Sequence, residues 1–86
     1  MTKAAQIKKL YKIAAEAKAA VEKAIYDEEI TEEAFDALSI AECEAYDELA
    51  AALVDFSKGE LTERDGNNLV LRCFDSLGET IAKLAA

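Results

Sequence analysis

Apolar side chains recur every three or four residues along most of the chain, which is the spacing of one face of an α-helix. The first such stretch covers residues 2–27, and its lysines and glutamates fall mostly on the opposite side. Because six apolar positions follow one another at this spacing, the pattern predicts an amphipathic helix over these residues. The six positions are Ile7, Leu10, Ala14, Ala17, Val21 and Ala24.

A second stretch with the same periodicity begins at Thr31, a residue type that is favoured at helix N-caps. The two glutamates that follow Thr31 would lie in the first helical turn, where the helix dipole favours negative charge. Ile30 and Phe35 flank this cap at the spacing of a hydrophobic staple. Gly59 marks the other end, because glycine adopts the left-handed conformation that ends many helices. The sequence therefore predicts a second helix over 31–57.

The last third of the chain shows a further helical pattern after a second polar junction. Thr62 and Asp65 resemble a capping box, which predicts a third helix over 62–85. The polar residues that follow Thr62 are also typical of a turn, so a helix that starts at Asn67 or Asn68 is the alternative.

Three helices with short connections pack as antiparallel neighbours. The predicted architecture is an all-α, three-helix, up-down-up bundle that forms a single domain of residues 1–86. The absence of proline and the presence of eighteen alanines favour helix at nearly every position. Since an alanine-rich core buries little area, we expect dimerisation to complete or extend it. The main alternative is a long helical hairpin whose core is completed by a second copy.

The net charge of −8 is unevenly distributed. Residues 1–26 hold six lysines and two glutamates, whereas residues 27–86 hold four basic and sixteen acidic residues. Phosphate contacts need a basic face, so direct binding of nucleic acid is not expected. The outer side of the second predicted helix carries an acidic face formed by Asp36, Glu44, Asp47, Glu48 and Asp55.

Two interpretations of this acidic face remain open. One is a solvated surface, which is the commoner use of charge. The other is docking onto the basic surface of a partner protein. The second interpretation includes an inhibitor of the phage or mobile-element type, which would imitate nucleic-acid charge and block a nucleic-acid-binding factor.

A second apolar seam lies more than a quarter-turn away from the main stripe of the second helix. One explanation of this seam is that a middle helix in contact with two neighbours needs a wide apolar face. The other is that the seam forms an interface with a second copy or another protein. On the second helix the seam consists of Ile40, Cys43, Ala50 and Val54, with Tyr46 between the seam and the stripe. Its counterpart on the third helix consists of Leu71, Gly78, Ala82 and Ala85.

The sequence offers little of the chemistry that catalysis or metal binding requires. The absence of histidine removes the imidazole base, the usual serine or cysteine triad and the mixed zinc site. Two cysteines cannot complete a four-ligand site by themselves. Cys73 lies on the core stripe and is expected to be buried, whereas Cys43 lies on the second seam. We therefore expect no enzyme activity, no cofactor and no metal.

The expected location is the cytoplasm, since no stretch approaches the length of a membrane span and the lysine-rich start does not form a signal peptide. Two cysteines without an export signal are expected to be reduced, and membrane binding is not expected. The function expected is a small acidic protein-interaction module that self-associates as a homodimer. The alternatives are an assembly subunit whose main partner is its own copy, and a bundle that binds a small ligand with Tyr11, Tyr46 and the space between the helices.

Overall fold

Every regular element in the described part of the chain is an α-helix. The computed structural model describes residues 2–84, with side chains as far as residue 82. Its four helices are α1 (Lys3–Ile25), α2 (Glu32–Phe56), α3 (Glu63–Arg72) and α4 (Phe74–Leu84). The prediction of an all-α fold is confirmed for these residues. Ala85, which the third predicted helix and its apolar seam included, lies outside them.

Three of the helices begin in the same way, with a threonine N-cap. The Oγ1 atoms of Thr2, Thr31 and Thr62 each accept a hydrogen bond of 3.1 Å from the backbone N–H three residues later. At the third cap, the Asp65 carboxylate also accepts from the Thr62 N–H at 3.2 Å, which completes the capping box. The box fixes the start of α3 at Glu63, so the alternative start at residues 67–68 is wrong.

The end of α2 is formed by two consecutive residues with left-handed backbone. Lys58 has φ 54° and Gly59 has φ 93°, directly after the C-cap at Ser57. Glycine tolerates this conformation at no steric cost, which confirms the role expected for Gly59. The Ser57 hydroxyl then accepts from the Leu61 N–H at 3.0 Å and holds the turn against the start of α3.

The predicted third helix is in fact two helices, and the chain bends between them at Cys73. This residue has φ −123° and ψ 30°, outside helical values, although backbone hydrogen bonds continue on both sides of it. Val70, before the bend, is buried in the common core, and Phe74, after the bend, stacks on Tyr11 of α1. Cys73 sits at the bend and is exposed, so its expected burial is wrong.

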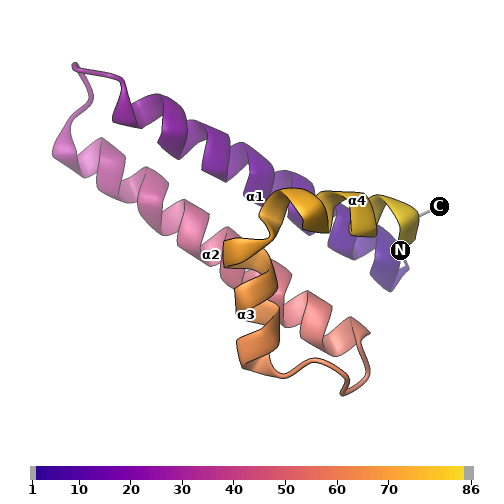
Figure 1. Cartoon of the computed structure of the whole chain (residues 1–86). Helices are drawn as coiled ribbons and strands as arrows, with labels where there is room; N and C mark the ends of the chain where they lie inside the picture. The colour runs from indigo at the N-terminus through magenta and orange to yellow at the C-terminus, as the bar shows by residue number, and fades with distance from the viewer. Residues whose placement is uncertain (1, 85–86) are drawn as a thin grey trace.

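The helices are arranged as a long antiparallel hairpin with a short cover at one end (Figure 1). α1 and α2 form the hairpin, α3 crosses the second half of α2, and α4 lies along the first half of α1. The molecule is elongated, with extents of 44 × 25 × 22 Å. A three-helix up-down-up bundle is therefore not the arrangement of the described residues.

The core gathers where all four helices meet. All the fully buried residues of α2 lie between Ala45 and Leu53, and its first half, 32–44, contains none. From the other helices the core includes Ile7, Ala14, Val70, Phe74, Leu77 and Ile81. The half of the hairpin next to the connection between α1 and α2 extends beyond α3 and α4 (Figure 1). We call this part the open half of the hairpin.

α4 is fixed to α1 by an aromatic contact and one hydrogen bond. The rings of Tyr11 and Phe74 stack with centroids 4.6 Å apart, and the Tyr11 hydroxyl donates to the Phe74 carbonyl at 2.9 Å. Gly78 makes room for this hydroxyl, because a Cβ at that position would lie only 2.5 Å from it. Gly78 thus serves the internal packing of the chain.

Removing this hydroxyl should destabilise the fold slightly. We expect Tyr11→Phe to lower the free energy of unfolding by about 1 kcal/mol, since the ring contact remains while one partly buried hydrogen bond is lost. Urea denaturation followed by circular dichroism measures the change. Tyr26→Phe is the matched control, because Tyr26 is 86% exposed. Equal midpoints for the wild type and Tyr11→Phe would contradict a stabilising role for the bond.

Candidate functional site

The second seam of α2 divides into a covered part and an exposed part. Ala50 is 4% exposed and Val54 is half-buried, because α3 passes directly over them. The crossing point is Gly66, where an added Cβ would lie 2.7 Å from Val54 Cγ2 and 3.1 Å from the Ala50 carbonyl oxygen. Ala50 and Val54 therefore pack within the chain itself, as expected for a middle helix that contacts two neighbours.

The exposed part of the seam lies on the open half of the hairpin. Ile40 is 58% exposed and Cys43 is also exposed. Tyr46, at the border, is half-buried because its ring packs against Phe74 at a centroid distance of 5.5 Å. On α3, Leu71 is 66% exposed and lines a small hollow with Tyr46. These positions remain available to another molecule.

The seam residues on α4 also differ in exposure. Gly78 lies under the Tyr11 hydroxyl, whereas Ala82 is exposed and lines a groove between α1 and α4. The structure therefore does not bring all the seam residues into one continuous surface. It places Ile40 and Cys43 on one half of the hairpin and Ala82 on the other.

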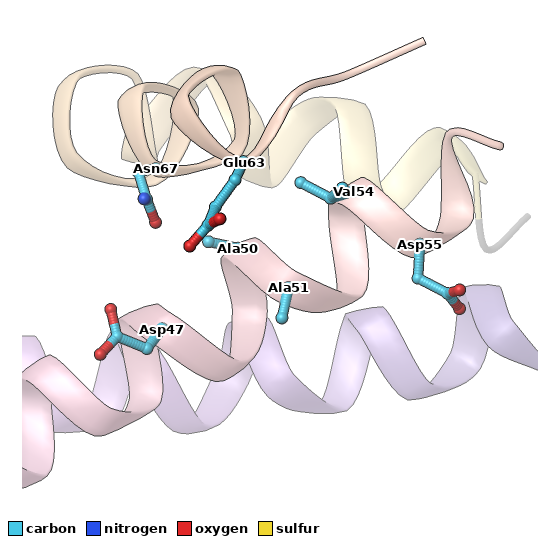
Figure 2. Close-up of a pocket in the computed structure, with 7 residues that line it drawn as sticks. All are labelled: Asp47, Ala50, Ala51, Val54, Asp55, Glu63 and Asn67. Atoms are coloured by element: carbon cyan, nitrogen blue, oxygen red, sulfur yellow. The ribbon is translucent and has the colours of Figure 1, made fainter. Parts of the chain in front are cut away.

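The five residues of the predicted acidic face, 36, 44, 47, 48 and 55, are all exposed. Asp55 is turned toward α1, where its carboxylate pairs with the Lys3 ammonium at 3.1 Å. Asp47 faces α3 across a hollow of about 650 Å³, into which Glu63 and Asn67 extend from above (Figure 2). The floor of this hollow is formed by Ala50 and Val54, so the crossing of α2 and α3 is bordered by carboxylates.

The Phe74 ring lies beside both Tyr11 and Tyr46, the two tyrosines of the small-ligand hypothesis. Both phenol rings pack against the Phe74 ring. Burial, reinforced by Glu42 and other nearby charges, raises the pKa of Tyr46 to about 12. Burial and Asp75 also raise the pKa of Tyr11, against an opposing effect of Lys18. Both phenols therefore stay protonated at neutral pH, and the Tyr11 phenol is the one that donates a hydrogen bond, to the Phe74 carbonyl.

A basic groove between α1 and α4 is a feature that the sequence reasoning missed. It has a volume of about 570 Å³, and its mostly apolar lining includes lysines of α1. The available signal was the spacing of Lys8 and Lys12, four residues apart on the same helix face. We define the basic groove by its lining residues, which are Ala5, Lys8, Lys9, Tyr11, Lys12, Ala15, Gly78, Ile81 and Ala82.

The described residues also lack a metal-ion cluster and a membrane-spanning helix. No group of three or more cysteine, aspartate or glutamate side chains within residues 2–82 is placed to hold a metal ion. Over the same part of the chain, none of the helices combines the length and the apolar character needed to cross a membrane.

Comparisons with known proteins identify no relative. No protein-family model, curated protein or solved structure matches this chain.

Proposed function

We propose that this protein is a small, non-catalytic interaction module that binds another protein through the exposed side of α2 on the open half of the hairpin. We call this surface the α2 docking face. It consists of Asp36, Ile40, Cys43 and Glu44. The observation that carries the proposal is Ile40, a large apolar side chain that is 58% exposed among carboxylates, on the half of α2 (residues 32–44) that holds no buried residue.

The geometry of the face supports binding to a basic surface with an apolar recess. Asp36, Ile40 and Glu44 are successive i, i+4 positions, so they form one ridge with about 6 Å between neighbours along the axis. Burying Ile40 would contribute about 1.5–3 kcal/mol to association. The flanking carboxylates would steer a basic partner into place and repel acidic ones.

Such a face suits a protein that acts by occupying its partner's surface. If the partner is a different protein, we favour an inhibitor as the function. Such an inhibitor would cover the basic surface of a nucleic-acid-binding factor. The two cysteines, Cys43 and Cys73, are both free and exposed, which fits a reducing compartment such as the cytoplasm.

A second candidate function is an assembly subunit whose main partner is its own copy. The observation that favours it is the lack of any fully buried residue in residues 32–44 of α2. A second chain that covers this half would add the buried area that the hairpin lacks there.

Ile40→Asp tests the α2 docking face. We expect it to weaken association at least about tenfold, because a charge replaces the apolar centre of the contact. The fold should be unaffected, since Ile40 is already exposed. Light scattering measures self-association, and retention of lysate proteins on the immobilised chain compares capture of other partners at low and high salt.

Ile25→Asp is the matched control, because Ile25 is an isoleucine that is 61% exposed at the end of α1 and belongs neither to the α2 docking face nor to the basic groove. Equal mass and equal capture for Ile40→Asp and the wild type would overturn the proposal. Retention that survives high salt would indicate that the apolar contact holds the partner more than the carboxylates do.

A further inference from the structure

The basic groove has the opposite chemistry to the α2 docking face. Its lining is mostly apolar and comes from α1 and α4, and it includes Lys8, Lys9 and Lys12. All three lysines are exposed, and within the described residues none of them forms an ion pair. The groove therefore offers an apolar surface and three available positive charges on a chain that is otherwise strongly acidic.

The dimensions of the two surfaces also agree. The ridge from Asp36 through Ile40 to Glu44 spans about 12 Å along α2 at 1.5 Å per residue. The groove extends from Ala5 to Ala15, about 15 Å along α1 by the same rise. An amphipathic helix laid in a groove between two helices is a common mode of protein recognition. Ile40 would meet the apolar lining while the flanking carboxylates meet the lysines.

Contact between two α2 docking faces is disfavoured by their charge. Each face carries the carboxylates of Asp36 and Glu44, and within the described residues neither has an ion-pair partner. A two-fold contact of like faces would bring these carboxylates together, and opposed like charges suppress association. A contact between unlike surfaces brings opposite charges together instead.

We propose that the basic groove between α1 and α4 binds the α2 docking face of a second copy of this chain. The inference rests on the proposed function of that face and adds the identity and chemistry of its partner surface. The groove is lined by the first half of α1 and by α4, whereas the docking face lies on the first half of α2, so the contact joins different parts of the two molecules. It is a heterologous contact in which lysines of one copy meet carboxylates of the next.

A charge-reversal experiment on the full chain tests this pairing. Lys8→Glu with Lys12→Glu reverses the groove, and Asp36→Lys with Glu44→Lys reverses the face. We expect each double variant alone to self-associate at least about tenfold more weakly than the wild type. An equimolar mixture of the two should associate within about threefold of the wild type, because opposite charges face each other again. Analytical ultracentrifugation gives the affinities, and circular dichroism confirms that these exposed substitutions leave the helices intact.

The outcomes separate the inference from the function on which it rests. A wild-type chain that stays monomeric at all concentrations overturns the inference and leaves the α2 docking face for a different protein. Self-association that is lost in Ile40→Asp but retained when the lysines are reversed also overturns the inference and keeps the proposed function. If the monomeric chain instead binds a fatty acid such as decanoate, and lysine reversal abolishes this binding, the groove belongs to a small anionic amphiphile and the inference fails.

Discussion

Phe74→Ala should release α4 from α1 and lower the free energy of unfolding by about 3–5 kcal/mol. The Phe74 ring is buried and contacts three side chains at once. It stacks on Tyr11, packs against Tyr46, and lies beneath the Lys18 ammonium at 5.3 Å from the ring centroid. Alanine would remove all of these contacts and leave a cavity between the hairpin and α4.

Urea denaturation gives the stability of Phe74→Ala, and near-ultraviolet circular dichroism reports the surroundings of the two tyrosines. Phe35→Ala is the matched control, because Phe35 is only half-buried and lies on the open half of the hairpin. Phe74→Leu keeps most of the apolar volume and should lose less stability, which makes the series readable even if the alanine variant unfolds. A loss for Phe74→Ala no larger than that for Phe35→Ala would contradict the role of Phe74 as the anchor of α4.

Gly66→Ala should lower the free energy of unfolding by about 1–3 kcal/mol, although alanine is the better helix former. Helix propensity alone would favour the substitution by about 1 kcal/mol. The added Cβ, however, would lie 2.7 Å from Val54 Cγ2 and 3.1 Å from the backbone oxygen of Ala50. Neither atom moves easily, since valine is stiff at χ1 and the other atom belongs to the backbone of α2. The crowding therefore decides the sign.

Thermal and urea denaturation measure this effect, and Asn68→Ala is the control within the same helix. Asn68 is exposed, so its replacement should change stability only through propensity, with a small gain of about 0.5 kcal/mol. A more stable Gly66→Ala variant would show that α3 can move away from α2 without cost. That result would remove the explanation for the close crossing at Ala50.

The parts of the fold that could be predicted from the sequence are those determined by local chemistry. The threonine caps at Thr31 and Thr62 and the left-handed Gly59 depend on residues within one or two turns, and the structure has all three. The apolar periodicity likewise placed α1 and α2 within two residues of their observed bounds. These features need no knowledge of which helix lies beside which.

The bend at Cys73 could not be predicted, because its cause lies in other helices. No proline or glycine occupies the bend. The bend arises because α3 packs closely against α2 at Gly66, while Phe74 packs against Tyr11 of α1. The sequence alone does not assign the crossing to Gly66, since a glycine within a polar run has the same appearance whether it breaks a helix or permits a close crossing.

The candidate site was predictable only in part for the same reason. Helical spacing identified the second seam on α2, from Ile40 to Val54, but not the point at which α3 stops covering it. That point depends on the short length of α3, which ends at Arg72. The basic groove needed α4 to lie beside Lys8 and Lys12, an arrangement that follows from the bend.

The open half of the hairpin has a consequence for the motions of the chain. Residues 32–44 of α2 contain no fully buried side chain, and in the facing part of α1 beyond Ala14 only Ala24 is buried. Local opening costs little free energy where few apolar contacts break, so backbone amides there exchange with solvent faster than those around Leu49. The two halves of α2 thus differ in the protection of their amides from exchange. A molecule bound to residues 32–44 would slow amide exchange in that half first.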